Sequence, residues 1–209
     1  MMSVRIQSLF DTPGKARMSA EDYIASPQSA HKSDLIEGVF VMASPASIAH
    51  EDIQYFIGTT MRNFVTARHL GLVAGPNMAF RLSDDNVYQP DVSFLQQDRL
   101  HLAGEVYVYG APDLAVEVIS PSSRQYDAFE KRINYARAGV REYWLVDPIE
   151  RSVAIYTLEG DQFVRVAQSD DLLRSHVLPG YWLQLGWIFP PAGALRPGEL
   201  DVARAQGLI

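Results

Sequence analysis

Residues 113–120, with the sequence DLAVEVIS, form a nearly continuous apolar run that constrains the fold more than any other feature of the chain. Such a run is typical of a central β-strand that other layers cover on both faces. Strand alternation places Glu117 on one face with Ala115 and Ile119. A carboxylate in this position loses its hydration and needs a cation, a hydrogen-bond donor or a proton. The sequence therefore predicts a covered sheet and a partner for Glu117.

The remaining pattern combines helices and strands in one unit without internal repeats. Helices are expected at 18–24, from Ser44-Pro45 to near Gly71, and at 124–138. Strand patterns occur at 34–42 (bending at Gly38), 72–74, 78–82, 87–95, 113–120, 142–146, 152–158 and 162–168. We expect one mixed α/β domain over residues 18–189. A flexible segment at 1–17 precedes it, and a tail rich in proline and glycine at 190–209 follows it.

The composition excludes several classes of protein. Cysteine is absent, which excludes disulfide frameworks, thiolate zinc sites and cysteine nucleophiles. No apolar run approaches the roughly 20 residues that a membrane-spanning helix needs, and residues 1–14 lack the apolar stretch of a signal peptide. We therefore expect a cytoplasmic protein without a membrane partner. The 18 basic and 25 acidic residues give a net charge of −7, so a nucleic-acid partner would have to meet a local basic patch.

A second candidate acid, Asp91, lies in the segment VYQPDVSF at 87–94. Alternation predicts an apolar and a polar face for this strand. The apolar set is Tyr88, Pro90, Val92 and Phe94, and the polar set is Gln89, Asp91 and Ser93. We expect the apolar set to face the core and the polar set to face a cleft or solvent. Asp91 and Glu117 can each be structural acids, and they form a site only if their strands lie side by side.

The helix after the strand of Glu117 supplies basic side chains. One of its faces carries Arg124, Asp127, Lys131 and Tyr135. The alternative is a solvated stripe with a surface ion pair between Asp127 and Lys131. The five histidines are scattered, and His50 is either a surface residue or a supporting group. The motifs HExxH, GxGxxG, GxxxxGK[ST] and GxSxG are absent, so histidine zinc sites, nucleotide binding and serine hydrolysis lack their usual signals.

Several motifs occur together in a recognisable order. They are DLIEG at 34–38, SPAS at 44–47 with His50, QPDVSF at 89–94, PDLAVEVISPSS at 112–123, Lys131 with Tyr135, GVREYWLVDP at 139–148 and LPGYWLQL at 178–185. This combination closely resembles the Uma-type family of putative restriction endonucleases, a branch of the PD-(D/E)XK nuclease superfamily, over about residues 18–189. The resemblance implies a restriction-endonuclease-like core, in which helices flank a central mixed β-sheet.

The resemblance also implies a set of site residues. By match to the family motifs, Pro90-Asp91 is the PD element and Glu117 is the acid of the (D/E)XK element. Ile119 stands where that element usually has lysine, and Lys131 on the next helix matches the displaced lysine of the family. The first strand usually reads Glu-Leu-Ile-Asp-Gly, whereas here the acids are exchanged, so Asp34 is one methylene shorter than the usual acid. The other candidates for supporting roles are His50, Gln89 and Tyr135.

The implied reaction is hydrolysis of phosphodiester bonds in nucleic acid, with DNA as the expected substrate. Mg²⁺ or Mn²⁺ is the implied cofactor because hard divalent ions prefer carboxylate oxygens. The implied ligands are Asp91, Glu117 and the carbonyl of Val118. Lys131 would orient water or stabilise the developing charge, so Lys131→Ala is expected to lose cleavage but to retain thermal stability. Over residues 120–141, five basic residues against two acidic ones predict a modest phosphate-facing patch.

Two other functions remain open at this point. One is a catalytically weak nuclease fold that serves as an interaction module for nucleic acid or protein. The other is a metal-dependent hydrolase of a small phosphate or other ester, which would suit the acidic surface. The presence of Asp91, Glu117 and a lysine favours the nuclease. We also expect a homodimer, because two sites related by a two-fold axis cut both strands of a duplex most simply.

Overall fold

The run at 113–120 contains β8 (Leu114–Val118) in the computed structural model, which describes residues 17–43, 45–120, 126–168 and 170–209. The same sheet contains β3 (Gly71–Ala74), β6 (Val92–Gln96), β9 (Glu142–Asp147), β10 (Ser152–Glu159) and β11 (Gln162–Arg165). Its order is β11-β10-β9-β8-β6-β3, so β8 lies in the interior between parallel β9 and antiparallel β6. All residues of β8 are buried, which confirms the covered central strand.

A second, five-stranded sheet packs beside the first. Its strands are β1 (Ser33–Ile36), β2 (Val39–Met42), β4 (Ala79–Arg81), β5 (Val87–Tyr88) and β7 (Tyr107–Tyr109), in the order β2-β1-β5-β4-β7. The expected bend at Gly38 is the turn of the β1–β2 hairpin, where a φ of +77° favours glycine. A two-stranded sheet pairs β12 (Leu172–Arg174) with β13 (Trp182–Gln184).

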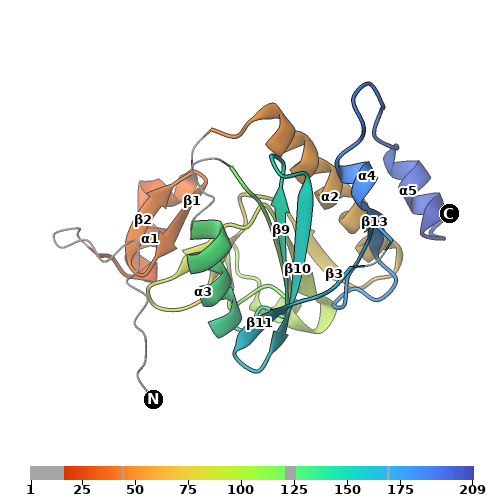
Figure 1. Ribbon diagram of the computed structural model, residues 1–209. Coiled ribbons are helices and arrows are strands. Elements are labelled where there is room, and N and C mark those ends of the chain that lie inside the picture. Colours follow the sequence, from red (N-terminus) through yellow and green to blue (C-terminus); the bar gives the residue numbers. More distant parts are fainter. Residues whose placement is uncertain (1–16, 44, 121–125, 169) are drawn as a thin grey trace, which may run out of the picture.

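Helices cover both faces of the six-stranded sheet. The helical segments are α1 (Ala20–Ala25), η1 (Pro27–Ala30), α2 (Ile48–Ala67), η2 (Gln97–Leu102), η3 (Tyr126–Lys131), α3 (Arg132–Arg137), α4 (Leu185–Ile188) and α5 (Glu199–Ala205). Figure 1 shows α2 and α3 on opposite sides of β9 and β10. The long helix begins later than predicted, because Ser47 caps it by accepting a hydrogen bond from the backbone of His50. Ser44 lies outside the described residues.

Alternate residues of β8 point to two different cores. Val116 and Val118 pack with Ile57 and other buried residues of α2 in the larger core. Ala115 packs on the opposite face with Tyr135 of α3 in a smaller, tyrosine-rich core. Glu117 alternates with Val116 and Val118, so its side chain emerges on the face that α3 covers.

The alternation predicted over residues 87–94 is wrong. Val92 and Phe94 enter the larger core, whereas Tyr88 enters the smaller one. The polar set is not open to solvent either, because Gln89 and Asp91 are buried. The reason is topological: β5 belongs to the five-stranded sheet and β6 to the six-stranded sheet. The chain crosses between the two sheets at residues 89–91, and this crossing interrupts the alternation of side chains between two faces.

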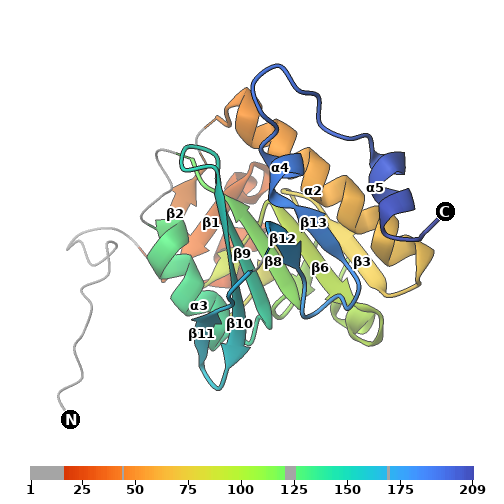
Figure 2. The same cartoon turned by 45° about the vertical axis from the view of Figure 1, so that its right-hand side comes forward.

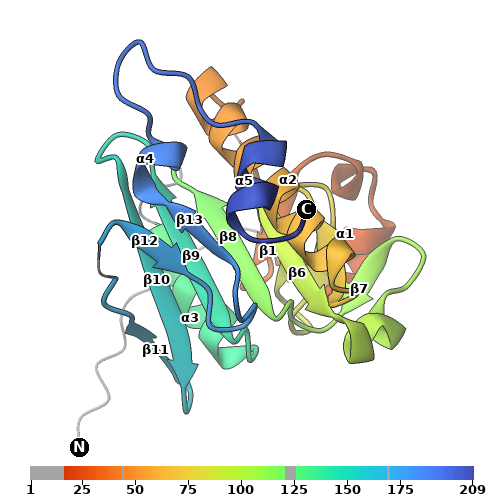
Figure 3. The same cartoon turned by 90° about the vertical axis from the view of Figure 1, so that its right-hand side faces the viewer.

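The C-terminal segment extends the packed structure past Phe189. Helix α5 packs against α2, and Val202 is buried in the larger core (Figure 3). The side-chain amide of Gln206 also donates to the backbone carbonyl of Trp182 at 2.7 Å. The prolines and glycines that indicated a tail therefore precede a docked helix. Among the described residues, no helix is both long and apolar enough to cross a membrane.

Glu142 holds the chain before β13 against β9, and its truncation is expected to destabilise the fold. Its carboxylate is fully buried and accepts from the indole of Trp144 at 2.5 Å and from the backbone N–H groups of His176 and Val177 at 2.7 and 2.8 Å. Glu142→Ala removes the acceptor of the buried Trp144 indole and of two partly buried backbone N–H groups, so the free energy of unfolding should fall by about 3 kcal/mol or more. Urea denaturation measures this loss, and an unchanged midpoint would contradict it.

Candidate active site

Asp91 lies where the chain enters β6 from the five-stranded sheet. Its carboxylate is 2% exposed and accepts a hydrogen bond from the backbone N–H of Val118 at 2.7 Å. The same oxygen lies 3.2 Å from Nε2 of His50 on α2, and the other oxygen forms an ion pair with Lys32. Asp91 therefore joins the end of β8, the first turn of α2 and the segment before β1.

These partners keep Asp91 ionised although it is buried. Burial by itself raises the pKa of this carboxyl, but the hydrogen bond from His50 and the charge of Lys32 outweigh burial and lower the pKa to about 2. Burial lowers the pKa of His50, and the hydrogen bond and charge of Asp91 outweigh it and raise the pKa above 6.5. Asp91 is thus a carboxylate at neutral pH, as a metal ligand must be.

Glu117 faces the amino group of Lys131 beneath α3. Its Oε1 accepts from Lys131 Nζ at 2.9 Å and from the hydroxyl of Tyr135 at 2.8 Å. Lys131 Nζ also lies 2.8 Å from Oδ2 of Asp34 on β1. Burial and the charge of Glu117 raise the pKa of Tyr135 well above 10, so its hydroxyl remains a donor. Lys131 is therefore a buried cation between two buried carboxylates.

The geometry around Lys131 follows from the local sequence. Ile119, two residues after Glu117, is buried and apolar, so that position offers no cation. The π-helical segment η3 ends at Lys131 and runs directly into α3, which carries Tyr135 one turn later. Lys131 is only 2% exposed, which excludes the surface ion pair considered above. The side chain of Asp127, the partner in that pair, lies outside the described residues.

Asp34 and Gln89 fix the first strand against the crossing at 89–91. Oδ1 of Asp34 accepts from the backbone N–H of Gln89 at 2.8 Å, and Oε1 of Gln89 accepts from the backbone N–H of Ser33 at 3.0 Å. Both side chains are buried. This reciprocal pair of hydrogen bonds fixes the position of Asp34, the acid that contacts Lys131.

The strands of Asp91 and Glu117 lie side by side, as the site hypothesis requires. In the β6–β8 ladder Val92 pairs with Val116, and Asp91 and Glu117 are the next residues on each strand. Each carboxylate contacts a different lysine: Asp91 contacts Lys32, and Glu117 contacts Lys131. Within the described part of the chain, no group of three or more His, Asp or Glu side chains is arranged to hold a metal ion.

Lys32 is a site residue that the sequence analysis missed. Its side chain is 30% exposed and forms the ion pair with Asp91. It precedes β1 in a short polar stretch, HKSD, which resembles many surface segments. No periodicity or motif in that stretch distinguishes a site lysine from a solvated one.

The basic patch predicted for residues 120–141 is not a single surface. Lys131 is buried, and the guanidinium of Arg132 lies over the ring of Tyr156 at 5.1 Å. Arg141 lies 3.6 Å from Asp113, at the end of β8 remote from Val118. Arg124 lies outside the described residues. Arg132 and Arg137 line one pocket together, whereas Lys131 and Arg141 lie apart from them.

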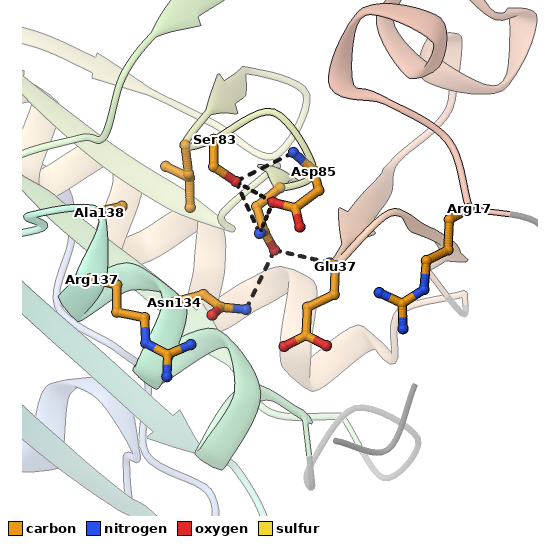
Figure 4. Close-up of a pocket in the computed structure, with 9 residues that line it drawn as sticks. Arg17, Glu37, Ser83, Asp85, Asn134, Arg137 and Ala138 are labelled. Carbon is orange, nitrogen blue, oxygen red and sulfur yellow. Dashed lines mark hydrogen bonds between the residues drawn. The ribbon is translucent and has the colours of Figure 1, made fainter. Parts of the chain in front are cut away.

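A polar cavity of about 300 Å³ adjoins α3 and the β1–β2 turn. Figure 4 shows the guanidinium groups of Arg17 and Arg137 on either side of the Glu37 carboxylate, with the Asn134 amide between Arg137 and Glu37. That amide also donates to the hydroxyl of Tyr88 at 2.7 Å, and the Tyr88 ring lies 5.8 Å from Lys131 Nζ. The cavity is thus connected to the packing that holds Lys131.

Comparisons with known proteins show the family and the fold of the chain. The family model Uma2, described as putative restriction endonuclease, matches residues 20–186. Among solved structures, the chain is similar to the crystal structure of a putative nuclease belonging to DUF820 from Anabaena variabilis ATCC 29413, with a TM-score of 0.70 and 20% sequence identity. The similarity covers 82% of this chain and 97% of that chain, and it shows a shared fold. No curated protein sequence matches the chain.

Proposed function

We propose, from the premise that this chain belongs to the Uma2 family of putative restriction endonucleases, that it is a metal-dependent endonuclease that hydrolyses phosphodiester bonds of DNA. Family membership supports a nuclease, and the restriction-endonuclease-like fold agrees with it. The divalent ion and the choice of DNA are the finer parts of the proposal, and they depend on the chemistry of the site.

The observation that carries the proposal is the pair of buried carboxylates on adjacent strands, Asp91 and Glu117, each beside a lysine. Such a donor set suits a hard divalent ion. The ligands would be the two carboxylates and the carbonyl of Val118, and the partly exposed Lys32 would move away from Asp91. When bound, Mg²⁺ or Mn²⁺ supplies polarisation of the phosphate and a more acidic water.

The remaining residues position this pair. Lys131 would stabilise the negative charge that develops on the phosphate or would orient the attacking water. Asp34 holds the amino group of Lys131 beside Glu117, and the hydroxyl of Tyr135 holds the Glu117 carboxylate. His50 holds Asp91 from the α2 side. We assign these four residues supporting or catalytic roles, in a protein that we expect to act in the cytoplasm.

One feature of the same site favours the interaction module as the second candidate. Asp91 and Glu117 are already neutralised by lysines of the same chain, as expected for a fold that has no need of a metal. In that case the chain would bind nucleic acid or protein without cleaving it. The net charge of −7 disfavours a large polyanion such as DNA, so small phosphate esters are also tested as substrates.

Cleavage assays separate these functions. Supercoiled plasmid, single-stranded DNA, RNA and free nucleotides are incubated with Mg²⁺, with Mn²⁺ and with EDTA. The proposal expects nicked or linear plasmid only with metal. Cleavage of nucleotides alone would indicate the small-substrate hydrolase, and binding without cleavage under every condition would indicate the interaction module.

We further propose that the protein acts as a homodimer, because cutting both strands is simplest with two sites. Tyr143, Trp144 and Tyr181, aromatic residues of the C-terminal region, are fully buried in this chain, so an interface would have to use other surfaces. Light scattering at micromolar concentration is expected to report twice the mass of one chain, 23.3 kDa. A monomer at that concentration would contradict the dimer.

A further inference from the structure

A groove opens beside Asp91 along the outer face of α2. It lies between α2 and the connection from β3 to β4, and it has a volume of about 240 Å³. Figure 2 shows α2 running along β3 and β6, the strands that it contacts. The lining includes Gln54, Tyr55, Gly58 and Arg62 from the helix, and Asp91 from the site. We refer to this depression as the α2 groove.

Gln54 is the observation that points to a ligand in the α2 groove. Its side chain is 9% exposed and lines the groove, and its Oε1 has no hydrogen-bond partner among the described residues. A buried amide oxygen without a partner is costly, and such groups are rare in folded proteins. Gln54 follows His50 by one helical turn, and His50 contacts Asp91. The unpartnered amide is therefore on the helix face that leads to the site.

The rest of the lining matches the parts of a nucleotide. Tyr55 is 69% exposed, so its ring is open to a stacking partner. Arg62 is exposed and can bind a phosphate. Gly58 has no side chain, so no side chain fills the groove between Tyr55 and Arg62 at this position. A glutamine amide is suited to a base edge, and an exposed tyrosine stacks on bases of any identity.

Size and charge restrict the ligand further. The α2 groove is smaller than the roughly 300–1,000 Å³ of sites that enclose a whole small molecule, so it suits one unit of a longer chain. Asp52, an acid on the same helix, is paired with Arg196 at 2.6 Å, which offsets its repulsion of a phosphate. Asp91, where the proposed cleavage takes place, is part of the groove lining.

We propose that the α2 groove binds one unpaired nucleotide of the strand that is cleaved, with Tyr55 on the base, Gln54 on its edge and Arg62 on a phosphate. This inference rests on the proposed nuclease function. A base within a duplex cannot stack on Tyr55, because its faces are covered by its neighbours. The protein should therefore bind single-stranded or locally unpaired DNA more tightly than a duplex of the same sequence.

Fluorescence anisotropy tests this inference without cleavage. A labelled single-stranded oligodeoxynucleotide and its duplex are titrated with the full chain in EDTA. Tyr55→Ala is expected to weaken single-strand binding by about tenfold, and Arg62→Ala and Gln54→Leu should each weaken it less. Tyr109→Ala and Arg174→Ala remove an exposed tyrosine and an exposed arginine elsewhere, and should bind as the wild type does.

The outcomes for the groove and for the nuclease can be told apart. Two results would overturn the proposal that the α2 groove binds a nucleotide, even if the protein cleaves plasmid with Mg²⁺. One is wild-type affinity of Tyr55→Ala for the single strand, and the other is an equal loss of that affinity in Tyr109→Ala. Loss of single-strand binding in Tyr55→Ala alone supports the groove, even if no cleavage is seen. Thermal melting shows whether Gln54→Leu is folded. If it is folded and binds the single strand as tightly as the wild type does, Gln54 does not contact the base.

Discussion

Glu117→Gln is expected to abolish metal-dependent cleavage of plasmid DNA while the protein remains folded. Glutamine has nearly the same shape, and its Oε1 can still accept hydrogen bonds from Lys131 and Tyr135. The negative charge is lost, and with it the preference of the site for a divalent ion. Lys131 retains its contact with Asp34, so no buried cation is left alone. We expect a decrease in the cleavage rate of about 10²-fold or more.

Asp113, the residue immediately before β8, provides a matched control. Asp113 is also buried and also paired with basic side chains, Arg99 and Arg141, at the other end of β8. Folded Asp113→Asn should retain cleavage, even if its free energy of unfolding is lower than that of the wild type. Calorimetric titration with Mn²⁺ provides the second readout, because Glu117→Gln should bind the ion more weakly than Asp113→Asn. Full cleavage by Glu117→Gln would remove Glu117 from the active site.

The sequence predicted those parts of the fold that depend on local pattern. The apolar run at 113–120 demanded a central strand because only a doubly covered position tolerates it. Spacings of three and four residues place five side chains on one face of α2, and all of them are buried: Ile53, Phe56, Ile57, Thr60 and Phe64. Lys131 was identified through a family motif, and the structure places its amino group between Asp34 and Glu117.

The parts that were missed depend on contacts distant in sequence. The crossing at 89–91 interrupts alternation because β5 and β6 join different sheets, and no local signal marks that change. Lys32 reaches Asp91 across 59 positions, so its role depends on tertiary structure alone. Helix α5 is short and follows prolines, and its docking depends on the apolar surface that α2 offers. The basic residues of 120–141 were counted together, but burial removes Lys131 from the surface and Arg141 lies beside Asp113, before the start of β8.

The surroundings of Lys131 change the expected effect of its removal on stability. The sequence analysis expected its removal to spare thermal stability, as for an exposed catalytic lysine. Instead, its amino group is buried and neutralises two buried carboxylates, Asp34 and Glu117. Removing one partner of a buried ionic group leaves uncompensated charge, which typically costs about 3–5 kcal/mol. Lys131→Met should therefore lose stability in the absence of metal as well as most of its cleavage.

The two effects can be separated by a second substitution. Asp34→Asn combined with Lys131→Met removes one charge of each sign, so urea denaturation should show part of the lost stability restored. Cleavage should stay about 10²-fold or more below wild type, because no cation is left beside Glu117. Arg132→Met is the control, since that guanidinium lies over Tyr156 and not in the site. If the double variant regained wild-type cleavage along with stability, Lys131 would be a purely structural partner of Asp34 and Glu117.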